Sequence, residues 1–367
     1  MFVVIYVISV YIHIPFCSNI CSYCDFSKMY YNKNYVEKYL KSLEKEIKSR
    51  YKGEIVKTFY IGGGTPSSLS LEELEQLFNI INIFNLDREC EFTIESNVEN
   101  LDIDKIKLIK KYGVNRVSLG VQTFDKDNLI YLNRKHTKED VFNVVSLLKE
   151  IGINNINIDL IYGIDNDINK VKKDIDYFLE LDNQHVSCYS LILEDNTVLK
   201  NNNTNYIDED IEYEMYEYIE EKLENNQYKH YEISNYAKVG YESKHNLVYW
   251  NNEFYYGFGL SSVSFIDNYR ITNTKNFTKY LNGNYVYSKD YEDKDLKIEN
   301  EIMLGLRKID GINLVNFKNK YGFFLEDIYD IDKLIDEGYL FKENGYLKIC
   351  KKYMYLSNSI LLLLEKK

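Results

Sequence analysis

Short apolar runs and longer amphipathic segments alternate along the first two thirds of the chain. The apolar runs fit β-strands at residues 4–13, 57–61, 91–96, 116–120, 155–162 and 185–191. Between them, apolar residues recur every three or four positions, which indicates helices at 34–47, 70–81, 104–112, 137–148, 168–181 and 207–224. Asn34 with Glu37, and Ser70 with Glu73, have the spacing of capping boxes that begin helices. The pattern predicts six strand-then-helix units in succession.

Repeated strand–helix units are typical of the α/β class, with a parallel sheet covered by helices. Six units are too few for a closed eight-stranded barrel, so we expect a partial (β/α)6 barrel. Two of its strands carry polar residues on one face, and these are Glu91, Thr93 and Glu95 on one strand and Asn155, Asn157 and Asp159 on another. Polar faces on such strands predict a barrel interior that is lined for a ligand.

The pattern changes beyond residue 200, where an Asn-rich tract precedes the helix predicted at 207–224. Residues 228–290 are rich in Tyr, Asn and Gly and indicate mixed strand and loop, whereas short helices and a hairpin around Asn344-Gly345 follow from Glu299. We therefore predict a barrel at 1–200, a C-terminal α+β extension at 201–298 and a small winged-helix-like module at 299–367.

Charge and composition restrict the partners of this 367-residue chain. Its formal net charge is −12, whereas nucleic-acid binders usually carry a basic surface, so we expect no nucleic-acid partner. The apolar start, MFVVIYVISVYIHIPF, lacks the basic region and cleavage site of a signal peptide and is too short to span a bilayer. These features predict a cytoplasmic protein, peripheral to a membrane only through an acceptor.

The strongest chemical signal is a cluster of three of the six cysteines, Cys17, Cys21 and Cys24, in a loop after the first strand. Soft thiolates are the usual ligands of iron–sulfur clusters. Three ligands leave one iron of a [4Fe–4S] cluster open, and that iron can chelate the amino and carboxylate groups of S-adenosylmethionine, whose reductive cleavage gives a 5′-deoxyadenosyl radical. The competing interpretation is a structural zinc site with His13 as fourth ligand. Zinc sites usually combine two cysteine pairs, and the chain has no second pair.

Further motifs follow the cysteines in order, and together they carry a family resemblance. The motifs are YIHIPFCSNICSYCDF, YIGGGTPSSLS, EFTIESN, GVNRVSLGVQTF, LNRKH, NIDLIYG, YEISNYA, HNLVYW and EIMLGLR. In these motifs the chain resembles the radical-SAM proteins related to oxygen-independent coproporphyrinogen III oxidase. The resemblance implies that S-adenosylmethionine is held by Tyr11, Tyr23, Gly63, Gly64, Thr65, Glu95, Gln122, Arg134 and Asp159.

One position separates two branches of that family. The oxidase branch has a further cysteine two residues after the third ligand, where this chain has Phe26. The segment Cys24-Asp25-Phe26 is similar to the haem-chaperone branch, which implies a protein that binds haem and transfers it to an acceptor haemoprotein, such as a membrane respiratory or storage protein. The alternative is an oxygen-independent coproporphyrinogen III oxidase that decarboxylates propionates by radical chemistry.

The motif His245-Asn-Leu-Val-Tyr-Trp250 resembles the HNxxYW sequence associated with haem binding in the chaperone branch. Histidine is a common axial ligand of haem iron, so His245 is the candidate haem ligand. The competing interpretation is a loop histidine beside aromatic core residues. We expect a protein that is not a coproporphyrinogen oxidase, whether or not it cleaves S-adenosylmethionine. We also expect an electron donor as a partner, and a homodimer is a candidate assembly.

Overall fold

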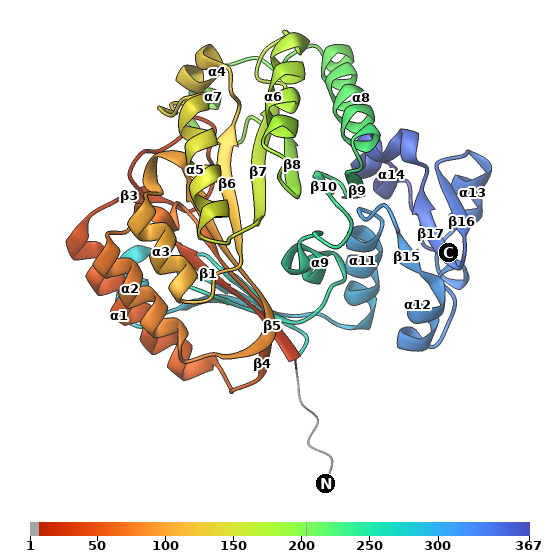
Figure 1. Cartoon of the computed structure of the whole chain (residues 1–367). Helices are drawn as coiled ribbons and strands as arrows, with labels where there is room; N and C mark the ends of the chain where they lie inside the picture. Colours follow the sequence, from red (N-terminus) through yellow and green to blue (C-terminus); the bar gives the residue numbers. More distant parts are fainter. Residues whose placement is uncertain (1–6, 203) are drawn as a thin grey trace.

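A computed structural model describes residues 7–202 and 204–367 and contains a 12-stranded sheet with the strand order β14-β13-β12-β11-β1-β4-β5-β6-β7-β8-β10-β9. Six neighbouring strands at its centre run parallel and curve into a partial barrel (Figure 1). They are β1 (Val7–Ile14), β4 (Ile55–Gly63), β5 (Asn85–Asn97), β6 (Arg116–Gln122), β7 (Asn155–Tyr162) and β8 (His185–Ser190). The predicted α/β fold with a partial (β/α)6 barrel is confirmed.

Helices cover the outside of this sheet (Figure 1). They are α1 (Lys33–Arg50), α2 (Leu71–Ile81), α3 (Ile103–Lys111), α4 (Lys126–Tyr131), α5 (Lys138–Glu150), α6 (Ile168–Glu180), α7 (Val198–Asn201) and α8 (Glu209–Asn225). The capping box of Ser70 and Glu73 is confirmed at the start of α2. The cap predicted at Asn34 is wrong, because the side chain of Asn32 accepts the first free N–H groups of α1.

Several strand boundaries also differ from the prediction. Both β4 and β5 begin earlier than expected, and β5 adds six residues before Glu91. The extra residues are mostly polar or charged, but Asn85 and Leu86 pair with Ile55 and Val56 of β4 before a shift in register, so backbone pairing extends the strands beyond their apolar parts. Residues 4–6 of the predicted first strand lie outside the described residues.

The segment after the barrel continues the same sheet at both of its edges. Antiparallel strands β9 (Lys229–Glu232) and β10 (Asn235–Ala237) follow β8, and β11 (Tyr255–Phe258) pairs in parallel with β1. Beyond β11 come β12 (Val263–Ile266), β13 (Tyr269–Asn273) and β14 (Val286–Tyr291), with helices α9 (Lys244–Trp250) and α10 (Phe277–Leu281). Tyr256, Phe258 and Tyr280 belong to the same hydrophobic core as the barrel strands.

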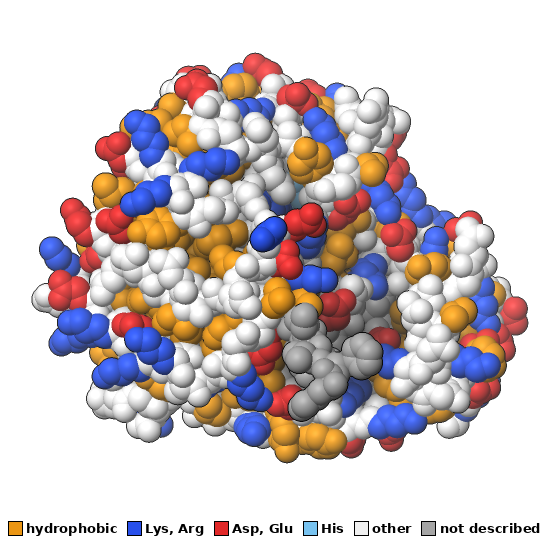
Figure 2. All heavy atoms as spheres, turned by 60° about the horizontal axis from the view of Figure 1, so that its bottom comes forward, with side chains coloured by type: hydrophobic (Ala, Val, Ile, Leu, Met, Phe, Trp, Pro, Cys, Tyr) orange, Lys and Arg blue, Asp and Glu red, His pale blue; other side chains and the backbone are white. Residues whose placement is uncertain are grey.

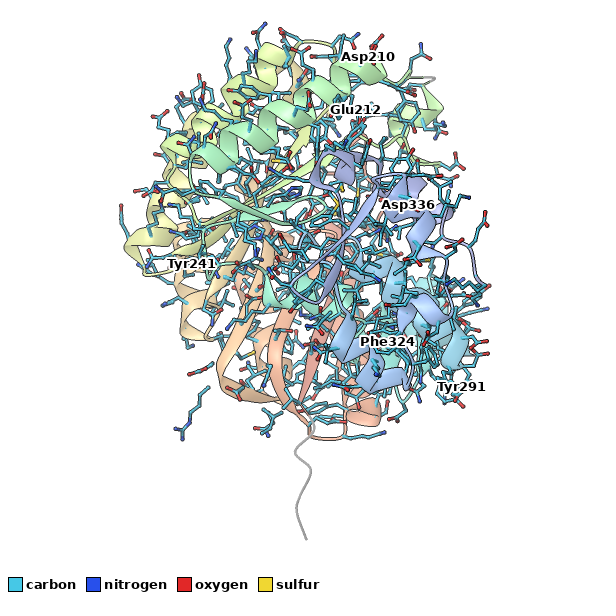
Figure 3. All side chains as sticks on the ribbon, turned by 90° about the vertical axis from the view of Figure 1, so that its right-hand side faces the viewer. Asp210, Glu212, Tyr241, Tyr291, Phe324 and Asp336 are labelled. Carbon is cyan, nitrogen blue, oxygen red and sulfur yellow. The ribbon has the colours of Figure 1, made fainter. Side chains whose placement is uncertain are left out.

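The C-terminal module has a hydrophobic core of its own. It contains α11 (Lys294–Gly305), β15 (Ile312–Asn313), α12 (Leu314–Tyr321), α13 (Ile331–Asp336), β16 (Leu340–Glu343), β17 (Tyr346–Ile349) and α14 (Ser357–Leu362). The hairpin expected at Asn344-Gly345 is confirmed, and both residues have the positive φ that a tight two-residue turn needs, 50° and 81°. Figure 3 shows Phe324 and Asp336 on this module and Asp210 and Glu212 on α8 above it. The three-part domain division stays a prediction.

No helix among the described residues has both the length and the hydropathy needed to cross a bilayer. On the face that Figure 2 shows, charged side chains of both signs are interspersed with hydrophobic ones.

Candidate functional site

The cysteine loop lies at the carboxyl ends of β1 and β4. It is closed by β2 (Phe16–Cys17) and β3 (Met29–Tyr30), whose parallel pairing brings the two ends of the loop together. The thiols of Cys17, Cys21 and Cys24 form no disulfide and line one cavity of about 480 Å³. Burial raises the pKa of the Cys17 thiol to about 11, and the neighbouring thiols act in the same direction. A cationic group at this site would favour the thiolates instead.

Three glycines at the carboxyl end of the second barrel strand, β4, allow the chain to approach this loop. A Cβ atom on Gly64 would lie 2.9 Å from the sulfur of Cys17, and one on Gly63 would lie 2.6 Å from the ring of His13. Gly63 also has a φ of 118°, which favours glycine. A Cβ on Gly62 would lie 2.8 Å from the Glu95 carboxyl group, so each glycine makes room for a different part of the site.

Arg134 joins the cysteine loop to the barrel rim. Its guanidinium donates to the Asn97 side chain at 3.0 Å and to the Gly120 carbonyl at 2.6 Å, and forms an ion pair of 3.1 Å with Glu99. It also lies 3.9 Å from the sulfur of Cys21. These bonds fix a positive charge next to the thiols, where it favours a thiolate or a ligand carboxylate.

Glu95 on β5 and Asp159 on β7 both line the cavity. Glu95 accepts hydrogen bonds from the Tyr60 hydroxyl at 2.8 Å and from the Gly63 N–H at 2.9 Å. Asp159 accepts from the Ser118 hydroxyl at 3.0 Å. Burial raises the pKa of both carboxyl groups, that of Glu95 to about 7, because the exposure they retain is to the cavity and not to bulk solvent.

Other residues predicted to hold S-adenosylmethionine occupy the rim of the same cavity. Gln122 ends β6 with a φ of 72°, which is uncommon for a residue other than glycine and points to a functional constraint. The Thr65 hydroxyl donates to the sulfur of Cys17 at 3.6 Å. Tyr23 lines the cavity from the cysteine loop. The structure thus brings together eight of the nine predicted residues, which are Tyr23, Gly63, Gly64, Thr65, Glu95, Gln122, Arg134 and Asp159.

Tyr11 is the exception, because it does not line that cavity. Its hydroxyl bonds to the Nδ1 atom of His13 at 2.9 Å, and the Nε2 atom of His13 bonds to the Ser27 carbonyl at 2.8 Å. Burial lowers the pKa of His13 to about 4, so the ring is neutral near pH 7. In this structure Tyr11 therefore supports the end of the cysteine loop through His13.

His245 lies inside the barrel at the start of α9 and is 1% exposed. Its Nδ1 bonds to the Thr58 hydroxyl at 2.8 Å, and its Nε2 bonds to the Tyr249 hydroxyl at 2.8 Å. Its ring also stacks on Tyr60 with centroids 5.1 Å apart. Both ring nitrogens are occupied, so an iron could bind His245 only after one of these hydrogen bonds breaks.

The Glu91 carboxylate explains why His245 is buried. It accepts hydrogen bonds from the backbone N–H groups of Lys244 and His245 at 3.1 and 3.0 Å, and thus holds the N-terminus of α9 against the barrel. Burial and the nearby Arg116 lower the pKa of His245 to about 3, so the ring is neutral near pH 7.

Several polar residues that line the cavity are not among those predicted from the sequence, and they are Tyr60, Asn97, Arg116, Ser118, Ser187 and Tyr189. Arg116 and Ser118 are the more instructive of these. Alternate residues of a strand lie on the same face, so Arg116 and Ser118 lie on the same face of β6 as Gly120 and Gln122. This alternation in the sequence could have identified them.

The chemistry of these residues fits an iron–sulfur cluster with S-adenosylmethionine beside it. Three unpaired thiols line one cavity, with a fixed arginine next to Cys21 and a hydroxyl donor next to Cys17. Carboxyl groups suited to ribose hydroxyls or an amino group lie on the neighbouring strands.

Comparisons with known proteins agree with this geometry. Residues 11–177 match the Radical SAM superfamily. A structure of coproporphyrinogen III oxidase (HemN) from Escherichia coli superimposes with a TM-score of 0.85, at 21% sequence identity, over 97% of this chain and 89% of that one. This likeness shows a common fold.

Closer similarity is found to proteins named heme chaperone HemW. The protein from Lactococcus lactis is 41% identical, with 96% of each chain covered. Those from Bacillus subtilis and Escherichia coli are 37% and 32% identical, with 96% of this chain and 97% of theirs covered. The chain therefore belongs to the HemW family of radical-SAM proteins.

Proposed function

We propose that this protein is a haem chaperone, built on a radical-SAM barrel, that binds haem and passes it to an acceptor haemoprotein. The observation that carries the proposal is similarity at 32–41% identity, over nearly the whole chain, to proteins named heme chaperone HemW. Phe26 supports it, because the side chain is 64% exposed beside the cysteines, at the position where the oxidase branch has a further cysteine.

The barrel has separate parts for the cluster and for S-adenosylmethionine. Cys17, Cys21 and Cys24 would hold a [4Fe–4S] cluster, which supplies an electron for reductive cleavage of S-adenosylmethionine when such cleavage occurs. Arg134 would orient the carboxylate of the cofactor, because its own bonds fix the guanidinium in place. Glu95 and Asp159 would accept hydrogen bonds from its ribose hydroxyls or amino group.

For haem, the candidate ligand is His245 in a rearranged α9. The iron would replace the Tyr249 hydroxyl at Nε2, while the bond of Nδ1 to Thr58 would orient the ring. Coordination at this atom therefore requires a movement of α9 or Tyr249. A ligand that becomes available only by rearrangement suits a protein that must release its haem again.

The test is haem binding by the full chain that survives gel filtration, followed by haem transfer to an acceptor depleted of haem. His245→Ala should lose the bound haem. His185→Ala is the matched control, because His185 is also buried and bonds through both nitrogens, to Asn157 and Tyr231. Equal haem loss in both variants would remove the assignment of His245, and absence of haem from the wild-type protein would remove the proposed function.

The proposed function includes three proposals about the partners and the assembly of the protein. The acceptor is a membrane respiratory or storage haemoprotein, an electron donor reduces the cluster, and the chain forms a homodimer. Sedimentation of the holoprotein with and without haem tests the last of these.

A further inference from the structure

Arg116 is a buried cation in the interior of the barrel, and it forms no ion pair with any described residue. It is 2% exposed and lies at the first residue of β6. Its Nε atom has no hydrogen-bond partner. The arginine ion pairs among the described residues are those of Arg50, Arg134 and Arg270. Burying a charge without a counter-ion is costly, so this arrangement points to a group that is supplied from outside the chain.

The side chain lines the cavity at a place distinct from Arg134. Arg116 pairs in the sheet with Thr93 and Asn155, two residues before Glu95 on β5 and four before Asp159 on β7. Arg134, by contrast, lies at the rim, where its two terminal nitrogens bond to Asn97, Glu99 and Gly120, although its Nε is unpaired as well. The cavity therefore has one arginine at its mouth that is paired with a carboxylate, and one at its base that forms no ion pair among the described residues.

The charge of Arg116 acts on the carboxyl groups of Glu95 and Asp159 and partly opposes the effect of burial on their pKa values, but neither carboxyl group forms an ion pair with it. Glu95 is engaged by Tyr60 and Gly63, and Asp159 by Ser118 and Asn157. Burial raises the pKa of both, so part of the Glu95 population is protonated near pH 7. The two histidines that Arg116 faces, His185 and His245, have lowered pKa values because of burial and the charge of Arg116, and they remain neutral.

The aromatic hydroxyls around Arg116 do not supply a negative charge either. Burial raises the pKa of Tyr60 and Tyr231 well above the usual range, so both remain neutral. A guanidinium donates two parallel hydrogen bonds to a carboxylate. A phosphate dianion would fit less well, because a single cation would balance only one of its two charges and the carboxyl groups of Glu95 and Asp159 line the same cavity.

We propose that Arg116 binds the carboxylate of a second ligand at the base of the barrel cavity, beneath the residues assigned to S-adenosylmethionine. The carboxylate belongs either to a propionate arm of haem or to a separate small carboxylic acid. This subsite is formed by the barrel interior alone, so carboxylate binding at Arg116 can be tested whether or not the protein transfers haem.

The experiment measures the melting temperature of the reconstituted holoprotein against sodium propionate, at constant ionic strength. Propionamide is the neutral isostere. The wild-type protein should show a saturable rise with propionate and none with propionamide. Arg116→Gln should weaken propionate binding about tenfold or more, because a charge-assisted bidentate contact is lost. Arg88→Gln removes an exposed arginine of β5 and should respond as the wild type does.

A second readout separates ligand binding from a structural role. Without propionate, Arg116→Gln should melt at or above the wild-type temperature, because an unpaired buried charge is removed. A lower melting temperature together with an unchanged propionate response would overturn the proposal. So would an equal response of the wild type to propionamide.

Two further arms cover the source of the carboxylate and a variant that fails to fold. If haem competes with propionate and haem dimethyl ester does not, the ligand is a haem propionate; if neither competes, it is a separate acid.

If Arg116→Gln does not fold, wild-type crystals with 3-bromopropionate give the answer by anomalous scattering. A bromine peak beside Arg116 supports the subsite, and peaks elsewhere only would overturn it.

Discussion

At the cysteine end of the barrel, the candidate metal ligands keep free bonding capacity, whereas at the α9 end both nitrogens of the candidate haem ligand are already bonded. The thiols of Cys17, Cys21 and Cys24 are unpaired and border a cavity. His245, at the other end, uses both nitrogens in hydrogen bonds within the protein. The difference indicates that the cofactor site is formed in advance, while the candidate haem ligand becomes available only after a rearrangement.

The largest expected effect comes from removing a thiol at the cysteine end. Cys24→Ser should reduce the iron content of the anaerobically reconstituted protein to near background, because two thiolates hold a cluster poorly. Cys188→Ser is the control, since Cys188 is a buried free thiol of β8. Iron is measured per chain by colorimetry. Full iron content in Cys24→Ser would place the cluster elsewhere.

Next in size is the loss of space beside the cysteine loop. Gly64→Ala places a methyl group 2.9 Å from the Cys17 sulfur and from the Pro15 carbonyl carbon. We expect a loss of about 1–3 kcal/mol in unfolding free energy and a reduced iron content. In Gly53→Ala the added methyl group meets nothing within 4 Å, so only its φ of +92° costs stability and iron should stay bound. Equal iron loss in the two variants would contradict this account.

A smaller effect is expected on the pH dependence of stability, through the buried carboxyl group of Glu95. The folded-state pKa of Glu95, about 7, lies above its ordinary value of 4.5. The folded state therefore binds more protons than the unfolded state between these pH values, so stability falls as pH rises through this window. The contribution of Glu95 to that loss is on the order of 3 kcal/mol.

Glu95→Gln should remove that contribution. The difference in unfolding free energy between variant and wild type, measured in urea at pH 5 and pH 8, should shift in favour of the variant at pH 8. An identical difference at both pH values would show that Glu95 does not titrate in this range.

The smallest expected effect comes from removing the hydrogen bond between Tyr249 and His245 at the α9 end. Tyr249→Phe removes the hydroxyl at the Nε2 atom of His245 and should cost about 0.5–1.5 kcal/mol in stability. If His245 binds haem through this atom, haem affinity should rise in the variant. Tyr255→Phe alters a neighbouring tyrosine and leaves His245 bonded, so its haem affinity should not change. Lower affinity in Tyr249→Phe would point to the tyrosine itself as the ligand.

The sequence predicted the cysteine end of the barrel much better than the α9 end around His245. The six parallel strands and the cysteine loop follow from local patterns, and the bounds of β7, Asn155–Tyr162, match the prediction. Eight of the nine predicted S-adenosylmethionine residues meet in one cavity because strand ends of a parallel sheet lie at one edge.

The α9 end depends on contacts between distant segments. The pairing of β11 with β1 joins Tyr255 to Ser9, and the Glu91 carboxylate holds α9, which lies more than 150 residues later. No local pattern around His245 encodes these contacts. The free guanidinium of Arg116 was missed for a related reason, since a sequence shows that a residue is charged but not that its neighbours are engaged elsewhere.

The central claim is that this barrel handles finished haem and does not process its precursor. The most direct measurement uses one anaerobic sample of the reconstituted protein with S-adenosylmethionine and a reductant, to which haem and coproporphyrinogen III are added in separate aliquots. We predict haem that stays with the protein on gel filtration and a coproporphyrinogen concentration that does not change. Consumption of coproporphyrinogen with release of carbon dioxide, in a sample that retains no haem, would contradict the account.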